Sequence, residues 1–409
     1  MAVIKLYNLA RMTTATSGTG TITLGSAATV GGVLYLSFAA AGVSDAEVVM
    51  YGIADTSNSE VGYGTYTSAG TTLTRNVLRS TNSNNAISLS GSAQVFITGL
   101  AENIMLGAMQ PQGRLTLTSA TPVLTTTVSG ATTVYYALYQ GNMCPIYNGA
   151  FFVNTPFTEL SQATTDNTKS PAAATTNSNY DMFVWNDAGT IRCTRGPAWT
   201  SDTGRGTGAG TTELVLTNGI YLNNVAITNG PGASRGTYVG TIRTNGSSQV
   251  DYIFGAVAAG GTAASFGLWN CYNRVRVGTF IGDTADSWTY GTTTIRPANN
   301  SSTFRASFVR GLNEDACQAE YGTLINSAAA GAGAIYIGLD STTAFSGRSA
   351  FMASGSGNSY AVAQYDALPG LGFHYLQALE YAGAANATFY GDNGNSAVYQ
   401  MGMNVSLWL

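Results

Sequence analysis

The chain has 409 residues and a formal net charge of −4, and 9% of its residues are charged, against roughly 25% in an ordinary soluble protein. The acidic balance excludes the basic surface that nucleic-acid binding needs, so we expect no nucleic-acid partner. Glycine supplies 50 positions, and 23 tyrosines add to a polarity otherwise carried by hydroxyl and amide groups. Such a composition is typical of all-β proteins. Because a charge-poor monomer is poorly protected against association, it also favours a homo-oligomer.

Targeting signals are not apparent in the sequence. No stretch of the sequence contains the ~18 consecutive apolar residues that a membrane span needs, so we expect no membrane span. The first ten residues lack the apolar core and cleavage site of a signal peptide. We therefore expect synthesis in a cytoplasm and no secretory route.

Residues 1–108 are expected to form a small β-sandwich or barrel module. Seven runs of alternating apolar and polar residues follow one another at the spacing of about 8–12 residues that is typical of these folds. Clusters of Gly, Asn and Ser separate the runs. They cover residues 19–25, 31–38, 47–54, 60–67, 71–79, 84–90 and 92–100.

Three strings occur in a fixed order within Asp45–Glu102: Glu60–Tyr66 (EVGYGTY), Gly70–Arg75 (GTTLTR) and Val95–Thr98 (VFIT). This succession resembles a module near the start of minor virion proteins of tailed bacteriophages. In them a Glu-Val-Gly-x-Gly-Thr-Tyr run precedes Gly-Thr-Thr-Leu-x-Arg and a closing Val-Phe-Ile-Thr. The resemblance implies that the module docks on a phage particle.

A domain boundary is expected at Ile104–Arg114, where Gly107, Pro111 and Gly113 interrupt the alternation. The alternative is an ordinary loop inside one domain. Residues 109–409 are expected to form a larger, jelly-roll-like β-sandwich body, with a further division near residue 230 as an option. Four Asn-Gly dipeptides mark its turns, each typical of a type I′ hairpin. They lie at residues 148–149, 218–219, 229–230 and 245–246.

The clearest strand pattern lies in Ser234–Val277. Tyr238 and Ile242 share one side of an alternating run, and Thr237 and Thr241 lie on the other, as expected of a half-buried strand. Two further alternating runs follow within this stretch. We therefore expect it to form the central sheet of one large antiparallel domain.

The last of these runs places Trp269 and Cys271 on one side and Tyr272, Arg274 and Arg276 on the other. Guanidinium groups hold planar, multidentate contacts. We expect the outward Tyr272, Arg274 and Arg276 to contact another subunit or another sheet.

A second resemblance rests on Tyr238–Thr244 and Trp269–Arg274. It is to the body domain of phage tail-associated, fibre and spike-like structural proteins, in which a Tyr-Leu-Gly-Thr-hydrophobic-Arg-Thr strand precedes an aromatic-Asn-x-Tyr-Asn-Arg strand. Here Val239 stands in the Leu position, and the Gly/Ala tract 255–265 replaces a more polar connector. The resemblance covers most of 130–350 and implies a homotrimer.

The chain offers little for catalysis or metal binding. His374 is the only histidine, which argues against a His base or a multi-His metal site, and we expect it in the core or an interface. Two disulfides are arithmetically possible, but we expect buried free thiols, because Cys is among the most buried residue types. The four cysteines are Cys144, Cys193, Cys271 and Cys317. No cofactor and no metal site is expected, and the oxygen-rich Asp392–Asn395 and the Gly-rich Arg205–Gly210 are interpreted as turns.

Glycoside cleavage needs two carboxyl groups that flank a sugar. The candidates are Asp283 with Asp286, Glu314 with Asp315, and the isolated Asp251 and Glu320. If their segment is extended, Glu314 and Asp315 point to opposite faces and do not share a substrate. We assign no catalytic residue, and a polysaccharide depolymerase remains an alternative.

The sequence supports binding of a sugar without cleavage better than it supports glycoside cleavage, because of its aromatic residues. Trp199, Trp288 and Tyr290 lie in turn-rich polar stretches where a ring could stack on a sugar. The alternative for these three is packing or a contact between subunits. Trp185 and Trp269 lie in alternating strands and are expected in the core.

These observations lead us to expect a non-enzymatic bacteriophage virion protein of spike or fibre type, docked on head or tail by its N-terminal module. Its partners would be other virion proteins, with host surface polysaccharide as a candidate. The alternatives are a capsid decoration or collar protein without a receptor role, and a depolymerase.

Overall fold

The structure is a computed structural model that describes residues 6–100, 110–327, 332–352, 355–383 and 385–409, without the side chains of 351–356. The protein is all-β, with 52% strand and 1% helix, which confirms the expected fold class. It forms two compact units, which are described separately. Unit 1 contains residues 1–109 and 147–154, and unit 2 contains residues 110–146 and 155–409. Most of the expected boundary, Ile104–Arg114, lies outside the described residues.

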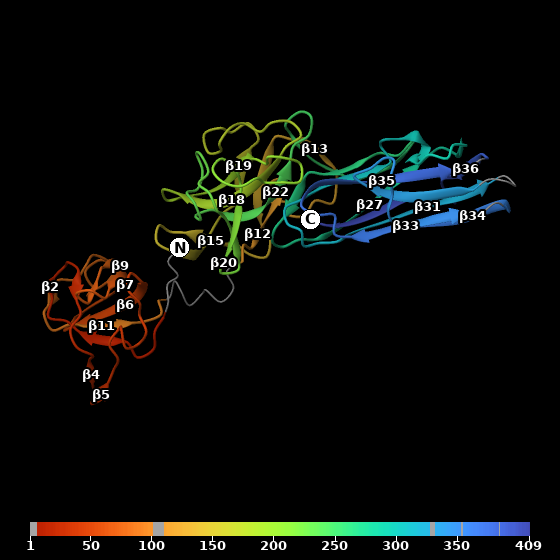
Figure 1. Cartoon of the computed structure of the whole chain (residues 1–409). Helices are drawn as coiled ribbons and strands as arrows, with labels where there is room; N and C mark the ends of the chain where they lie inside the picture. Colours follow the sequence, from red (N-terminus) through yellow and green to blue (C-terminus); the bar gives the residue numbers. More distant parts are fainter. Residues whose placement is uncertain (1–5, 101–109, 328–331, 353–354, 384) are drawn as a thin grey trace. The chain divides into compact units, whose positions relative to one another are not determined.

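Unit 1 is organised by a seven-stranded sheet with the order β1-β11-β6-β7-β8-β3, in which β9 also pairs with β7. Two small pairs, β10-β2 and β4-β5, complete it (Figure 1). The strands are β1 (Arg11–Thr13), β2 (Ser17–Gly18), β3 (Ile22–Thr23), β4 (Thr29–Val30), β5 (Val33–Leu34), β6 (Val48–Asp55), β7 (Asn58–Thr67), β8 (Thr72–Leu73), β9 (Asn76–Ser80), β10 (Leu89–Ser90) and β11 (Gln94–Ile97).

A buried ion pair lies inside unit 1. Glu60 on β7 and Arg75 are both almost fully buried, and the guanidinium of Arg75 donates to both carboxylate oxygens of Glu60. Glu60 also accepts hydrogen bonds from the Tyr51 hydroxyl (2.8 Å) and the backbone N–H of Ile87 (2.9 Å). A buried carboxylate needs such partners, because desolvation otherwise makes its charge costly. The two charged ends of the strings Glu60–Tyr66 and Gly70–Arg75 are therefore one structural element.

Three smaller sheets lie in or border unit 2. One has the order β12-β14-β17, and β15 and β16 form a two-stranded sheet. The third has the order β19-β18-β22-β21-β20, with β26 also paired to β22. The strands are β12 (Gly113–Thr116), β14 (Thr133–Leu138), β15 (Met143–Tyr147), β16 (Phe152–Pro156), β17 (Leu160–Ala163), β18 (Asn179–Asp187), β19 (Thr190–Ala198), β20 (Leu214–Thr217), β21 (Ile220–Asn223), β22 (Thr237–Arg243) and β26 (Leu268–Asn270).

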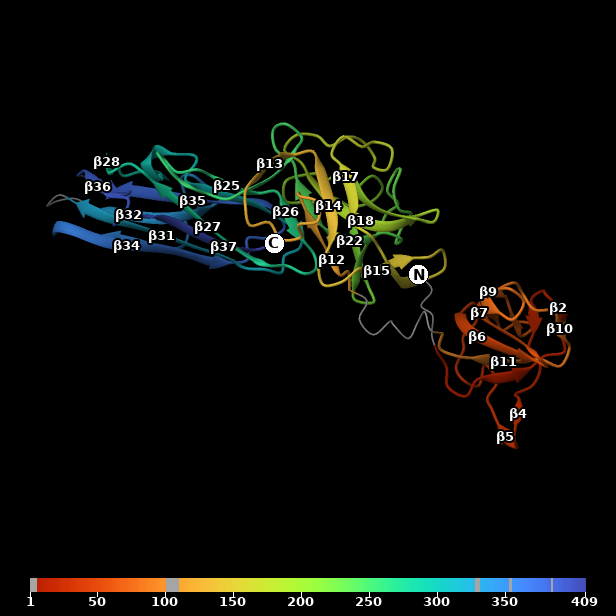
Figure 2. The same cartoon turned by 180° about the vertical axis from the view of Figure 1, so that it is seen from behind.

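The largest sheet of unit 2 has fifteen strands and folds over into two layers (Figures 1 and 2). Their connection runs through β33 and β34, which pair at Arg348 and Gln364. The first layer contains β13 (Val128–Ala131), β23 (Val250–Ile253), β25 (Ala264–Phe266), β29 (Arg296–Pro297), β30 (Arg305–Arg310), β32 (Gly333–Leu339), β33 (Ser346–Met352) and β35 (Gly372–Ala382). The second contains β24 (Val257–Ala258), β27 (Arg276–Asp283), β28 (Ser287–Tyr290), β31 (Cys317–Ser327), β34 (Gly355–Ala367), β36 (Ala387–Tyr390) and β37 (Gly402–Trp408). The 3-10 turn η2 (Ala298–Asn300) precedes β30.

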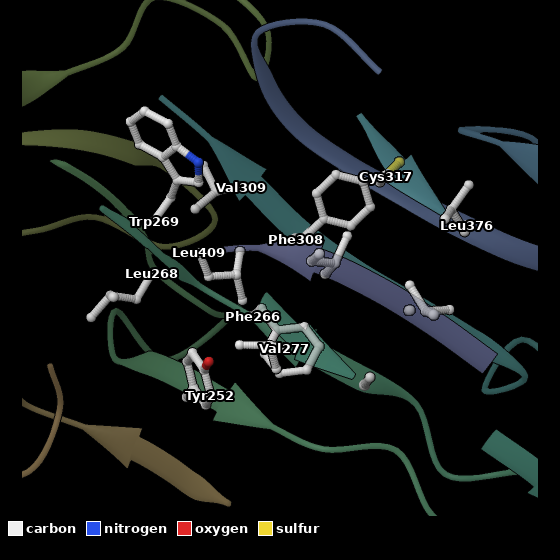
Figure 3. Close-up of a cluster of buried hydrophobic side chains, with 14 of the residues drawn as sticks. Tyr252, Phe266, Leu268, Trp269, Val277, Phe308, Val309, Cys317, Leu376 and Leu409 are labelled. Carbon is white, nitrogen blue, oxygen red and sulfur yellow. The ribbon is translucent and has the colours of Figure 1, made fainter. Parts of the chain in front are cut away.

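The core of unit 2 is one continuous cluster of buried side chains that the layers share. The ring of Phe304, just before β30, and the ring of Tyr321 on β31 lie 5.4 Å apart edge to face. Leu409 is fully buried in the same cluster, together with Phe266 and Val277 (Figure 3). The sequence at residues 373–383 permits a strand or one to two helical turns, and its β surroundings favour the strand. The apolar residues 406–409 likewise favour a packed strand. Both expectations are confirmed, as β35 and β37.

The expectation of one central antiparallel sheet in residues 234–277 is wrong. β22 and β26 pair with each other in the six-stranded sheet, whereas β23, β25 and β27 belong to the fifteen-stranded sheet. The turn explains the separation. The Asn245 side chain accepts hydrogen bonds from the N–H groups of Ser247 and Gln249, and Ser248 adopts a positive φ of 59°. This loop is wider than a two-residue type I′ turn, so β23 leaves the sheet that contains β22.

Of the four Asn-Gly dipeptides, the one at Asn218-Gly219 has positive φ at both residues, 51° and 83°. It connects β20 and β21, where Thr217 pairs with Ile220 across a two-residue loop. That dipeptide forms a type I′ hairpin. The other three also lie at turns, as expected, but none of them combines a positive φ at both residues, so the type I′ geometry is absent there. An Asn-Gly pair permits this turn, but the length of the loop between paired residues decides whether it forms.

The prediction that β22 is half-buried is also wrong, because both of its faces are covered. Tyr238 and Ile242 are buried as expected, but Thr237 and Thr241 are fully buried as well. The Thr237 hydroxyl donates to the Pro145 carbonyl, and the Thr241 hydroxyl donates to a carboxylate of a neighbouring strand. Threonine can enter a core in this way, since a satisfied hydroxyl loses the main cost of desolvation.

Candidate functional site

The three aromatic residues predicted to contact glycans lack the exposure that this role needs. Trp199 is 6% exposed and Tyr290 is 9% exposed. The Tyr290 hydroxyl donates to the Thr294 carbonyl at 2.8 Å. Trp288 is partly buried, its indole N–H donates to Glu380, and its ring stacks on Phe389. The packing alternative therefore describes these side chains, and burial removes them from the candidate binding surface.

A buried polar network surrounds Trp199. Arg205 forms an ion pair with Asp181 at 2.6 Å, and both side chains are 10% exposed or less. Its guanidinium also donates to the Tyr238 hydroxyl at 3.2 Å and lies 4.4 Å from the centroid of the Trp199 ring. Burial alone would lower the pKa of Arg205, but the Asp181 carboxylate and Tyr238 raise it above its usual value. The Gly-rich Arg205–Gly210 segment thus supplies a structural cation and no phosphate loop.

The predicted interface residues do not form one outward strand face. Cys271–Val275 lies between β26 and β27, and Asn273 there has a positive φ of 58°. The Asn273 amide donates to the carbonyls of Pro111 and Gly113, which fixes this break in the strand. The premise of a continuous strand is therefore wrong.

Two of the predicted interface residues are engaged within the chain. The Tyr272 hydroxyl accepts a hydrogen bond from the backbone N–H of Tyr221. Arg274 forms ion pairs with Glu314 at 2.9 Å and Asp315 at 2.6 Å. The two carboxylates are expected to diverge only if their segment is extended. It is not extended, and both carboxylates reach the same guanidinium. Arg276 is exposed and lines a groove together with Glu314 and Asp315.

The other candidate carboxylates have structural partners. Asp283 is fully buried and accepts hydrogen bonds from the backbone of Gly260 and Ala285 and from the Asn299 amide. Asp286 is exposed. Asp251 accepts from Gly130 and Asn245. Glu320 differs from them, because it lies on an open sheet face.

His374 and the four cysteines are core residues, as predicted. His374 is 4% exposed, with its Nδ1 atom 2.7 Å from an Asp340 carboxylate oxygen. The cysteines are buried free thiols, which confirms that prediction. Burial raises the pKa of all four thiols, to about 12 at Cys193 and about 11 at Cys317. They are poor nucleophiles and poor metal ligands in this state.

The structure reveals a different candidate site on the outer face of β27, β37, β31 and β34. Two adjoining grooves of about 410 Å³ and about 420 Å³ share Arg276, Gln318 and Ser406. The first groove is also lined by Ala319, Glu320, Gln364, Asp366 and Asn404. The second is also lined by Glu314, Asp315, Ala316 and Trp408. We call the two together the outer groove.

Strand register places the polar side chains of the outer groove in two rows across the sheet. Ser406 lies opposite Gln318, which lies opposite Asp366. In the next row Asn404 lies opposite Glu320, which lies opposite Gln364. The amides of Gln318 and Gln364 donate to Asp366 at 3.1 Å and to Glu320 at 3.2 Å. Side chains directly opposite one another on antiparallel strands interact in this way.

The ends of the outer groove are aromatic. Trp408 is 46% exposed beside Arg276, its partner in the register. At the other end Gly282, Gly402 and Gly322 follow one another across β27, β37 and β31. A Cβ on Gly402 would lie 2.7 Å from the Phe280 ring, and one on Gly322 would lie 2.1 Å from the Tyr360 hydroxyl. Glycine is needed there because the two aromatic side chains lie directly over the backbone.

The sequence carried only part of the signal for this site. The alternation of Gln318 and Glu320 with buried Ala319 and Tyr321 is visible in the chain and marks a half-buried strand. The neighbouring side chains come from segments about 40 to 90 residues away in sequence. Nothing in the local pattern indicates that these segments pair.

Within the described parts of the chain, no helix has the length and apolar character to cross a membrane. In the same residues no group of three His, Cys, Asp or Glu side chains is placed to hold a metal ion. No protein-family model matches the sequence, and no curated protein matches it. The interpretation of the outer groove therefore rests on its geometry and on the chemistry of its residues.

Proposed function

We propose that the chain is a non-enzymatic structural protein of a tailed-bacteriophage virion, of spike or fibre type, made in the host cytoplasm. Its N-terminal module docks on the head or tail, and its body projects and contacts the host surface. The observation that carries the proposal is the ordered succession of the strings Glu60–Tyr66, Gly70–Arg75 and Val95–Thr98, which resembles phage minor virion proteins. A homotrimer is the oligomer that the resemblance favours.

An exposed apolar hairpin supports the docking role of unit 1. Val33 and Leu34 on β5 are 62% and 71% exposed, and β4 and β5 stand out from the rest of the unit (Figure 1). Leu9 is 65% exposed, and its carbonyl accepts a hydrogen bond from the N–H of the partly exposed Leu36. Contiguous exposed apolar side chains mark interaction surfaces more often than inert ones. We assign this hairpin to the contact with another virion protein.

Imaging of intact particles tests the location. We expect density for a projecting body, with a label on unit 1 nearest the particle. Full-length Val33→Ser/Leu34→Ser protein is expected to fold normally but to be depleted from particles. Density that lies flat on the capsomers would contradict the spike proposal and favour the alternative, a decoration or collar protein.

One feature supports the second alternative, a depolymerase. Glu320 and Asp366 occupy diagonal positions on neighbouring strands, where Cβ atoms are about 7–8 Å apart. Carboxyl groups of inverting glycosidases are about 6.5–9.5 Å apart. Both residues, however, are exposed and hydrogen-bonded to amides. Release of reducing ends from host glycan, abolished by Glu320→Gln, would establish the enzyme; the absence of any product would favour the structural role.

A further inference from the structure

We propose that the outer groove is a binding site for an uncharged oligosaccharide built of neutral hexoses. This inference rests on the proposed contact with the host surface, and it names the site and the ligand class. The site lies on β27, β37, β31 and β34 and does not include Trp199, Trp288 or Tyr290. It binds without cleaving.

The polar rows match the hydrogen-bonding capacity of sugar hydroxyls, each of which both donates and accepts. The carboxylates of Glu320 and Asp366 accept, the guanidinium of Arg276 donates, and the amides of Gln318 and Asn404 do both. Hydrogen bonds to charged groups are roughly twice as strong as neutral ones. The amide-carboxylate pairs within each row also fix the side chains before the ligand arrives, which reduces the entropy lost on binding.

Trp408 provides a place for the apolar face of a sugar ring. Its indole is nearly half exposed at one end of the outer groove. Four residues along β37 separate it from Asn404, which at about 3.4 Å per residue spans roughly 14 Å. The phenol of Tyr360, 62% exposed, lies one row beyond Asn404. This length accommodates more than one sugar ring.

The charge of the outer groove selects against acidic glycans. Glu314, Asp315, Glu320 and Asp366 line it, against the single guanidinium of Arg276. Arg274 pairs with Glu314 and Asp315, and Arg310 also pairs with Asp315, which leaves the carboxylates of Glu320 and Asp366 against Arg276. A sulfated or sialylated chain would be repelled by these groups, whereas a neutral one would not.

The same composition argues against a second copy of the chain as the occupant. Protein interfaces have cores that are depleted in Glu and Asp and enriched in aromatic residues. The middle of the outer groove contains amides, the Ser406 hydroxyl and two carboxylates, and the aromatic residue among its lining residues, Trp408, lies at one end. A ligand rich in hydroxyl groups fits this distribution better than an apolar protein surface.

The test uses the purified full chain on an array of neutral hexose oligosaccharides and their sulfated and sialylated counterparts, followed by titration of the best neutral probe. We expect binding of neutral probes only, weakened about tenfold or more by Trp408→Ala and by Gln318→Ala/Asn404→Ala. The matched controls are Tyr399→Ala, an exposed aromatic outside the outer groove, and Gln140→Ala, an exposed amide outside it. Both should leave affinity unchanged.

Three results would overturn the inference: no neutral probe binds, the groove variants bind as well as the controls, or the probe is cleaved. Loss of oligomer by light scattering in the groove variants, with no probe bound by the parent chain, would assign the face to a second copy. All of these measurements use protein in solution. Their failure therefore leaves the virion location, which imaging tests, untouched.

Discussion

The guanidinium group of Arg205 lies over the indole ring of Trp199, 4.4 Å from its centroid, while pairing with the buried carboxylate of Asp181. This contact explains why a tryptophan in a polar, turn-rich stretch lies in the core. A cation over an aromatic face is attracted to the ring, and its stem covers apolar surface. A segment of turns is thereby joined to the six-stranded sheet.

Removal of either partner of the Asp181–Arg205 ion pair should destabilise the folded protein. We expect Asp181→Asn or Arg205→Met to lower the free energy of unfolding by about 3–5 kcal/mol, because each leaves a buried group without its partner. The double variant should lose less than the sum of the two. Urea unfolding measures all three. The control is Asp187→Asn, whose ion pairs with Lys169 and Arg192 are partly exposed to solvent and should contribute at most about 1 kcal/mol. Additive losses in the double variant would contradict a direct Asp181–Arg205 coupling.

The Asp166 carboxylate should make stability depend on pH. Burial would raise its pKa, but hydrogen bonds from Thr168 and the N–H of Lys169 outweigh this and lower it below the usual value. A lowered pKa in the folded state contributes stability above the pKa of the unfolded chain, and that contribution disappears as the pH falls through the folded value. We expect Asp166→Asn to lower the free energy of unfolding by about 1 kcal/mol at pH 7. At pH 3 the difference should shrink. An equal difference at both pH values would exclude the charge as its origin.

The four cysteine thiols should be unreactive in the folded protein. With all four cysteines buried and their pKa values raised, we expect no reaction with a thiol reagent at pH 8 in native buffer and four equivalents in denaturant. Reducing agent should not change either count. A native count above zero, or a denatured count that rises on reduction, would show an exposed thiol or a disulfide.

Two glycines provide a matched test of turn geometry. Gly219 has a φ of +83° and Gly246 does not have a positive φ, and a Cβ on either would meet no atom within 4 Å. Gly219→Ala should therefore cost about 1 kcal/mol through backbone strain alone, and Gly246→Ala should be near neutral. Thermal unfolding of the two variants compares them directly. If both variants lose the same stability, backbone strain at a positive φ does not distinguish Gly219 from Gly246.

The sequence predicts strand class and periodicity well, because alternation is a local property. It identifies β35 and β37 as strands, the Asn218-Gly219 hairpin and the burial of the cysteines. It fails where long-range partners decide the outcome. Thr237 and Thr241 look solvent-facing, yet residues far along the chain satisfy their hydroxyls. Trp199 looks exposed until Arg205 and Asp181 are placed beside it.

The candidate site shows the same limit. Gln318 and Glu320 can be assigned to one face of a strand from their spacing alone. Their neighbours Asn404 and Gln364 cannot, since cross-strand register depends on which segments pair. Aromatic residues in turns are more conspicuous in a sequence than amides on a sheet.

The position of β37 between β27 and β31 has a consequence for biosynthesis. A nascent chain that has not yet reached Gly402 leaves β27 and β31 with unpaired edges, and their buried faces lack Val405 and Leu407. The second layer can then close only after this strand has left the ribosome, whereas unit 1 depends on early segments. Until that moment the open edges are exposed to other chains.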